Sequence, residues 1–221
     1  MPPRPKFTPL DGRLYEYLLA HRSPDDDVVR ELRDETARLR GHAVMQISPD
    51  QATLLRILVA ATGARRAIEV GTFTGFSALA IARGMPPDGQ LLCLDLSEEW
   101  TAIARRAWAK AGVARRIELR LGPAAETLRG LPASRQFDFA FIDADKRGYP
   151  VYWNEIVRRL RPGGLVAVDN VLWEGEVVQA EKHGEDLDAI RQFNEMVLAD
   201  TRVESVMLAV ADGLTLARKL P

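Results

Sequence analysis

Residues 69–77 read EVGTFTGFS, and this stretch decides the fold that we predict. It begins at the end of a short apolar segment, residues 67–70, which is typical of a buried strand, and leads into an apolar helical stretch at 77–83. Two glycines, Gly71 and Gly75, lie in the turn between them. Because glycine has no Cβ, a ligand can approach its backbone closely, so the turn is a candidate binding element.

The same alternation of strand, turn and helix continues from residue 66 onward. The expected strands are residues 67–70, 91–94, 117–121, 137–142 and 165–168. The expected helices between them are residues 77–83, 97–111, 124–131 and 152–160. Such alternation predicts right-handed crossovers and a parallel sheet that helices cover on both faces.

The C-terminal part departs from this alternation. After a helix near residues 187–198, two further strands are expected at 203–210 and 214–218, joined at Asp212-Gly213. So short a link allows only an antiparallel hairpin. We therefore predict an α/β fold with a doubly wound, Rossmann-like methyltransferase sheet of seven strands, mostly parallel, ending in an antiparallel hairpin.

The first 65 residues are expected to be helical and to form a cap or lid on an α/β core of residues 66–221, within one domain of residues 1–221. The expected helix boundaries are an end near His21, a start at Ser23-Pro24, an end at Gly41, a start at Ser48-Pro49 and an end at Gly63.

Composition excludes several classes of protein. The 221 residues include 30 basic and 31 acidic side chains, and this net charge of -1 provides no general attraction to nucleic acid or to an anionic membrane. The single Cys93 cannot form an internal disulfide, so we expect a reducing compartment, the cytoplasm. The longest uncharged stretch, residues 70–82, is too short to span a membrane, and residues 1–6 have no apolar run behind them, so we expect no signal peptide.

The glycine turn also indicates what kind of ligand binds. Its Gly-x-x-x-Gly spacing differs from the Gly-x-Gly-x-x-Gly pattern that holds a pyrophosphate, which favours a nucleoside without phosphate over NAD. Asp95 ends the second strand, where a carboxylate can accept hydrogen bonds from both ribose hydroxyls. Its alternative role is to cap the helix that begins near Ser97. The small residues Gly122-Pro123-Ala124 after the third strand are suited to border an adenine.

Polar clusters follow the fourth and fifth strands. Asp143, Asp145 and Lys146 end the first, and Asp169-Asn170 ends the second. Both clusters are expected at the same edge of the sheet as the glycine turn. Carboxylate and amide oxygens suit Mg²⁺ best, with Mn²⁺ and Ca²⁺ as alternatives, and three protein ligands leave about three octahedral positions for a diol and one water. An Asx-turn at Asp169-Asn170 and a solvated pair at Asp145-Lys146 are the simpler interpretations.

Together these motifs resemble the cation-dependent O-methyltransferases, the family of the catechol and caffeoyl-CoA O-methyltransferases. The segments that carry the resemblance are residues 69–77, 122–124, 141–146, 169–173 and 212–215, which occur in the family's order. The similarity extends from about Met45 to the C-terminus, whereas the first 40 residues match only in being helical.

The resemblance implies a role for each matching residue. Asp143, Asp169 and Asn170 would hold the divalent ion, and Lys146 would be the base near the substrate hydroxyl, with Asp143 as the second catalytic residue. Trp173, together with Lys146, would contact the acceptor ring. Contacts with the methyl donor S-adenosylmethionine would come from Met45, Ile47, Glu69, Gly71, Thr72, Ser77, Asp95, Ala124, Asp143 and Asp145.

The chain departs from the family pattern in one segment. Plant phenylpropanoid enzymes carry asparagine after the Leu-Trp pair, whereas this chain has Glu174, which argues against a caffeoyl-CoA substrate. The rest of residues 174–186 is highly charged and matches no acceptor-specific pattern.

We therefore predict metal-dependent methylation of one hydroxyl of an ortho-diphenol. The charge on the donor sulfonium vanishes as the methyl group leaves, so the nucleophile should be an oxyanion, which chelation to a cation favours. No covalent intermediate is needed, and Cys93 is expected in the core. A homodimer is expected because dimers are common among relatives.

Three different functions are compatible with parts of the sequence. The pairs Arg105-Arg106, Arg115-Arg116 and Arg158-Arg159 leave open a tRNA hydroxyl as acceptor, although solvated surface roles are the simpler interpretation. A second possible function is the binding of S-adenosylmethionine without catalysis. A third is that of an NAD-linked oxidoreductase.

Overall fold

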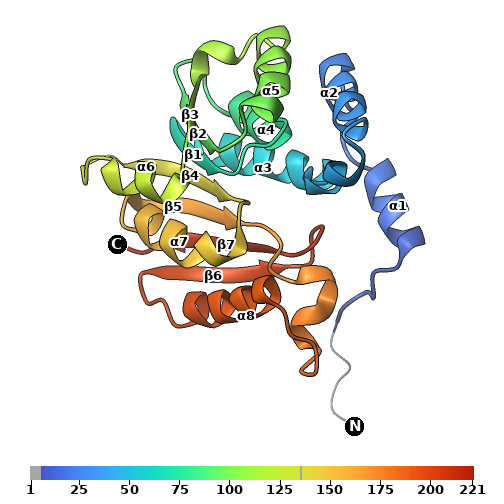
Figure 1. The fold of residues 1–221 in the computed structure, drawn as a ribbon, viewed down its shortest axis with the longest axis vertical. Helices are drawn as coiled ribbons and strands as arrows, with labels where there is room; N and C mark the ends of the chain where they lie inside the picture. Colours follow the sequence, from blue (N-terminus) through green and yellow to red (C-terminus); the bar gives the residue numbers. More distant parts are fainter. Residues whose placement is uncertain (1–5, 135) are drawn as a thin grey trace.

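The structure is a computed structural model that describes residues 6–134 and 136–221. The expectation of no signal peptide was based on residues 1–6. Residues 1–5 lie outside the described residues. Within the described ranges, seven strands form one sheet in the order β3-β2-β1-β4-β5-β7-β6 (Figure 1). The strands are β1 (Arg66–Val70), β2 (Gln90–Asp95), β3 (Ile117–Leu121), β4 (Phe137–Ile142), β5 (Leu160–Val168), β6 (Val203–Leu208) and β7 (Leu214–Lys219).

The strand directions confirm the predicted fold class. β1 to β5 pair with one another in parallel, whereas β7 is antiparallel to both β5 and β6. The strand order reverses between β1 and β4, so the turns after these two strands diverge and leave room for a ligand. Val70, the last residue of β1, pairs with Leu94 on one side and with Ile142 on the other, which brings three strand ends to one level.

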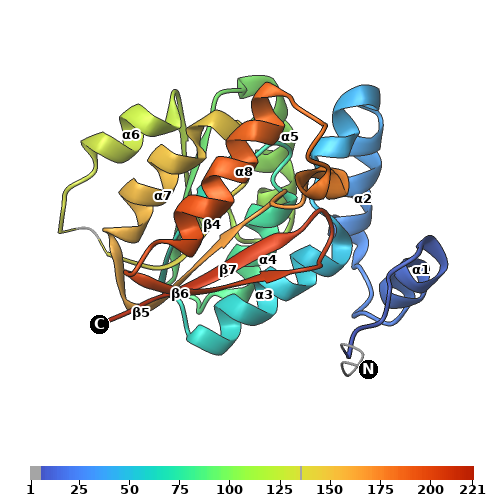
Figure 2. The same ribbon diagram turned by 90° about the horizontal axis from the view of Figure 1, so that it is seen from below.

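Helices cover both faces of the sheet (Figure 2). Because side chains alternate along a strand, Ala67, Cys93 and Phe141 face one buried cluster, and Ile68, Val70 and Ile142 face the other. Cys93 is a free, fully buried thiol in the core, as predicted. The first cluster packs against α2 (Asp27–Ala37), α3 (Pro49–Thr62), α4 (Phe76–Gly84) and α5 (Glu98–Lys110), and the second against α6 (Ala124–Gly130), α7 (Tyr149–Val157) and α8 (Glu185–Leu198).

Several helix boundaries follow from the predicted caps. The Ser48 hydroxyl accepts a hydrogen bond from the Gln51 amide at the start of α3, and Gly63 ends that helix with a left-handed φ of 59°. The Ser97 hydroxyl likewise accepts from the Trp100 amide at the start of α5. α1 (Gly12–Ala20) precedes these helices and buries none of its side chains.

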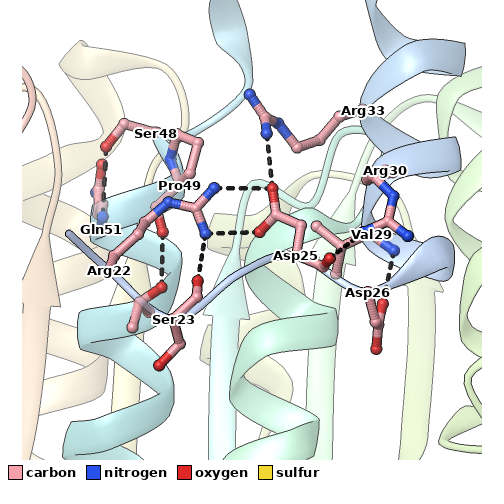
Figure 3. A network of polar contacts seen from close by, with 11 residues as sticks. Arg22, Ser23, Asp25, Asp26, Val29, Arg30, Arg33, Ser48, Pro49 and Gln51 are labelled. Atoms are coloured by element: carbon pink, nitrogen blue, oxygen red, sulfur yellow. Dashed lines mark hydrogen bonds and ion pairs between the residues drawn. The ribbon is translucent and has the colours of Figure 1, made fainter. Parts of the chain in front are cut away.

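The predicted limits of α2 were wrong at both ends. The helix begins at Asp27 rather than at Ser23-Pro24, because the Asp26 carboxylate, not Ser23, accepts from the Val29 amide. The guanidinium of Arg22 meanwhile donates to both carboxylate oxygens of Asp25, at 2.7 and 2.8 Å, and to the Ser23 carbonyl, which holds this segment outside the helix (Figure 3). α2 then ends at Ala37 instead of Gly41, and a 3₁₀ helix at Arg40–Met45 follows.

The predicted limits of α7, residues 152–160, were also displaced. The helix starts at Tyr149, with Pro150 in its first turn, where a missing N–H costs no hydrogen bond. It ends at Val157, because Leu160 already pairs with Phe137 in the sheet. The strand β5 consequently begins five residues earlier than the predicted residue 165.

A close backbone contact joins the ends of β1 and β4. Gly71 has φ of 86°, and a Cβ built there would lie 1.7 Å from the carbonyl oxygen of Asp143. The Asp143 amide donates to the Val70 carbonyl at 2.8 Å, so the two strand ends cannot separate without breaking the sheet. Glycine is therefore required at this position both by conformation and by space.

We expect Gly71→Ala to reduce the free energy of unfolding by more than about 4 kcal/mol, because the methyl group would overlap the Asp143 carbonyl. Gly112→Ala is the matched control, since Gly112 has a φ of 71° and no atom within 4 Å of the position that a methyl group would take. That variant should lose only about 1–2 kcal/mol from backbone strain. Urea denaturation measures both, and equal losses would show that the contact with Asp143 is unimportant.

Candidate active site

A cavity of about 1330 Å³ lies beyond the carboxyl ends of the parallel strands. Its walls include the turns after β1, β2, β3, β4 and β5, the starts of α3 and α4, and part of α1. Every site residue named from the sequence lines this cavity except Glu69, which lies behind its wall. The structure thus brings together residues from positions 45 to 173.

The Asp95 carboxylate shapes the glycine turn. One oxygen accepts from the amides of Thr72 and Phe73, each at 2.8 Å, and the other accepts from the Ser97 amide at 2.8 Å. The alternative role of Asp95 at the start of α5 is therefore present. Asp95 also lines the cavity, where a carboxylate oxygen has capacity for further donors. The sequence pattern did not reveal that this residue holds the turn itself.

Glu69 is a buried carboxyl without a hydrogen-bond partner among the described residues. Its side chain is fully buried in β1, and neither carboxyl oxygen is paired. Burial raises the pKa of Glu69 to about 8, although Ser77, Cys93 and Thr72 lie beside it and lower the value. The nearby charge of Asp95 adds to the rise. A carboxyl so placed is neutral over most of the physiological range, and a nearby cation would favour its ionised form.

The other predicted donor contacts also line the cavity. Ala124 begins α6 directly after the turn that ends β3, and Asp145 accepts a hydrogen bond from the Tyr152 hydroxyl at 2.5 Å. Burial raises the pKa of Tyr152, so its hydroxyl stays protonated and remains a donor. Met45 and Ile47 approach from the segment before α3.

Lys146 lies where the two polar clusters meet. Its ammonium donates to Asn170 Oδ1 at 2.7 Å, to the Tyr149 hydroxyl at 2.7 Å and to Asp143 Oδ1 at 3.2 Å. The Tyr149 hydroxyl in turn donates to the backbone carbonyl of Asp169 at 3.2 Å. Neither the solvated Asp145-Lys146 pair nor an isolated Asx-turn describes this arrangement, since Lys146 is buried and bonded to Asn170.

Asp212, to which the sequence analysis gave no role at the site, orients this cluster. Its carboxylate accepts from the Asn170 side-chain amide at 3.1 Å and from the Glu174 backbone amide at 2.6 Å. With its NH₂ group held by Asp212, Asn170 presents its amide oxygen to Lys146 and the cavity. Gly213 allows the approach, because a Cβ there would lie 2.4 Å from Leu172 Cγ.

The two carboxyls of the cluster share a buried environment. Burial raises the pKa of Asp169, and the neighbouring Asp143 charge raises it further. Burial also raises the pKa of Asp143, while Lys146 opposes the rise and Asp212 supports it. Two carboxyls that repel each other in a buried place favour a positive ion between them.

The loop after Asn170 places an aromatic ring at the cavity. Trp173 lies with its ring centroid 6.0 Å from Lys146 Nζ. Trp173 and Glu174 both have positive φ, 48° and 53°, which is unusual for residues with side chains. The hydrogen bond from the Glu174 amide to Asp212 helps to hold this strained turn.

In each of the three arginine pairs that left a tRNA acceptor open, at least one member has a structural partner. Arg106 pairs with Glu35, Arg116 donates to the Met85 carbonyl, and the buried Arg159 pairs with Glu155. In the described ranges, no group of three His, Cys, Asp or Glu residues is placed to hold a metal ion; the set above includes an asparagine. None of the described helices is long and apolar enough to cross a membrane.

Comparisons with known proteins agree with this geometry. A family profile described as O-methyltransferase matches residues 20–220. The chain is 38% identical to catechol O-methyltransferase domain-containing protein 1 of Mus musculus, over 96% of this chain and 82% of the mouse protein. It is 37% identical to caffeoyl-CoA O-methyltransferase 2 of Zea mays, over 94% of this chain and 83% of the maize protein. The solved structure of an O-methyltransferase from Bacillus cereus in complex with SAH superimposes with a TM-score of 0.84 at 32% identity, covering 94% of this chain and 97% of that one.

The buried Glu69 should make stability depend on pH. Its pKa is about 8 in the folded chain and near the ordinary 4.5 when unfolded, so the folded state holds a proton that the unfolded state releases. Stability should therefore fall as pH rises from about 5 to 8, and Glu69 should contribute on the order of 4 kcal/mol to this loss. In Glu69→Gln this contribution should vanish, whereas those of Asp143 and Asp169, whose pKa values burial also raises, should remain.

Urea denaturation of the donor-free protein across that pH range measures the effect. Glu126→Gln, at an exposed carboxyl in the first turn of α6, is the matched control and should behave as the unaltered chain does. Parallel pH profiles for Glu69→Gln and the unaltered chain would show that Glu69 is ionised in the folded protein.

Proposed function

The chain belongs to the O-methyltransferase family, and we propose that it methylates one hydroxyl of a small ortho-diphenol held by a divalent cation, preferably Mg²⁺. It is an S-adenosylmethionine-dependent O-methyltransferase. The observation that carries the finer proposal is the meeting of Asp143, Asp169 and the inward-facing oxygen of Asn170 at one side of the cavity.

Asp143, Asp169 and Asn170 fit a hard cation. They offer oxygen ligands only, and the pKa of each carboxyl is raised by burial, so the two gain from a positive ion. The ion would polarise the acceptor hydroxyl and favour its oxyanion. Mn²⁺ and Ca²⁺ prefer the same ligands and are the alternatives.

The opposite side of the cavity fits the methyl donor. Gly71, Thr72, Ser77 and Asp95 line the turn after β1 and the end of β2, where they would contact the amino-acid and ribose parts. Ala124 and Asp145 would border the adenine, and Met45 and Ile47 would cover the donor. Glu69 would act from behind the wall, because a cationic donor favours its ionised carboxylate.

Lys146, as the neutral amine, would accept the proton of the acceptor hydroxyl at its Nζ atom and become an ammonium. It lies between Asp143 and Asn170, beside the positions where the acceptor oxygens would be held. The resulting oxyanion would attack the methyl carbon of the donor, and the electron pair of the broken carbon–sulfur bond would return to sulfur and neutralise the sulfonium. Trp173 would lie along the acceptor ring and hold it in line for the transfer.

The charges of the cavity support a small acceptor without phosphate groups. Lys146 is the only basic side chain among the described residues that line it, whereas the acidic ones are Asp11, Asp95, Asp143, Asp145, Asp169, Glu174 and Asp212. Such a lining attracts the cationic donor and metal ion and repels a polyanion. It therefore supports a catechol over tRNA or a coenzyme A thioester.

We further propose the assembly and location of the enzyme. Residues 1–221 would form one domain, in which the N-terminal helices cap the cavity, since Tyr15 lines it and donates to Asp50 of α3 at 3.2 Å. The exposed apolar side chains of Phe7, Leu10 and Leu18 support a homodimer. A cytoplasmic enzyme fits the single free thiol of Cys93.

Asp169→Ala should abolish Mg²⁺-stimulated methylation of catechol, by about 100-fold or more, because the cation loses a carboxylate ligand. Affinity for S-adenosylmethionine should stay nearly unchanged. Asp186→Asn, at an exposed carboxyl of α8, is the control and should retain full activity. Labelled methyl transfer with and without chelator measures this, and full activity in chelator would exclude the cation mechanism.

Lys146→Ala should lower kcat by about 100-fold or more, since the proton acceptor is removed, with little change in donor affinity. Arg147→Ala is the adjacent control, because that side chain is exposed and pairs with Glu185 outside the cavity. An unchanged kcat in Lys146→Ala would remove Lys146 as the base. If tRNA but no catechol were methylated in the same assay, the acceptor class would be wrong.

A further inference from the structure

Gln51 is a buried amide that none of the roles above uses. It lies in the first turn of α3, where its backbone amide donates to the Ser48 hydroxyl at 3.4 Å (Figure 3). Its side chain is fully buried, yet neither Nε2 nor Oε1 has a hydrogen-bond partner among the described residues. A buried amide without hydrogen-bond partners lowers the free energy of unfolding. Its presence therefore indicates a site where ligand binding supplies the missing partners.

The position of Gln51 indicates what that ligand site is. Gln51 lines the same cavity as Asp143, Asp169 and Asn170. Its side-chain amide lies beside the Asp169 carboxyl. Of the three ligand candidates, Asp169 is the most buried, so an added donor matters most there.

Gln46 shows that side-chain amides in the cavity wall do not in general lack hydrogen-bond partners. It also lines the wall, but its Nε2 already donates to Thr36 Oγ1 at 2.9 Å and to Thr74 Oγ1 at 3.3 Å. That amide therefore joins the loop to α2 and to the glycine turn. Gln51 lies in α3, within the first 65 residues that we expected to form a helical cap. Its Nε2 and Oε1 atoms are both available to the polar cluster.

We propose that Gln51 is a positioning residue of the cation site, an inference that rests on the proposed function. When the cation is bound, its NH₂ group donates to the Asp169 carboxylate and holds it in its ligating orientation. Its carbonyl oxygen accepts a hydrogen bond from a water or acceptor hydroxyl beside the cation. An amide supplies the donor and the acceptor without adding a third negative charge to Asp143 and Asp169.

The test is direct binding of Mn²⁺ to the full chain, measured by calorimetry without donor or acceptor. We expect Gln51→Leu, which keeps the size of the side chain, to weaken Mn²⁺ binding by about 10–100-fold. S-adenosylmethionine affinity should be unchanged. The melting temperature of the metal-free variant should rise by about 2–4 °C, because an unpaired buried amide is replaced by an apolar group.

Two further variants separate the possible outcomes. Gln51→Met should weaken Mn²⁺ binding in the same way, which covers a failure of the leucine variant to fold. Gln192→Leu makes the same change at an exposed position of α8 and should bind Mn²⁺ as the unaltered chain does.

Unchanged Mn²⁺ affinity in both Gln51 variants, with tight binding by the unaltered chain, would overturn this inference and leave the proposed function standing. Absence of Mn²⁺ binding by the unaltered chain would overturn both.

Discussion

The contact between Gly71 and the Asp143 carbonyl is the constraint on which the site depends. It holds the end of β1 against the end of β4, at the point where the strand order reverses. Asp143 therefore belongs to two regions at once: its backbone supports the glycine turn, and its carboxyl belongs to the cluster with Lys146. With the donor on the turn and the acceptor at the cluster, as we propose, this one backbone contact would bring together the two molecules between which the methyl group is transferred.

The buried carboxyl groups near this contact lower the stability of the ligand-free fold. Burial raises the pKa values of Glu69, Asp143 and Asp169, so each resists ionisation in the empty protein. Ligands that carry positive charge relieve this cost and so stabilise the folded state by binding to it. The sulfonium donor and a divalent cation both have the required sign. The same groups that weaken the empty fold thus favour its ligands.

The C-terminal hairpin contributes to the site as well as to the sheet. β7 pairs with β5, which brings the turn at Asp212-Gly213 against the loop that follows Asn170. Asp212 then sets the orientation of the Asn170 amide and holds the strained turn at Glu174. An amide rotated by half a turn would present its nitrogen to the cavity, where it could bind no cation. The antiparallel ending is in this way linked to the chemistry of the cluster.

The sequence by itself determined the sheet, its antiparallel ending and the set of residues at the strand ends. Apolar periodicity and the rule that parallel strands end at one edge are local or topological, so residues as far apart as Gly71 and Asp169 could be assigned to one site. Tertiary structure alone decided the hydrogen bonds of Asp212 and Tyr149, the burial of the unpaired Gln51 amide, and the start of α2 at Asp27. These features depend on which side chains meet after folding. Arg22 pairs with Asp25, Asp212 accepts from Asn170, and Gln51 lies beside Asp169. Such pairings between distant residues leave no periodic pattern along the chain.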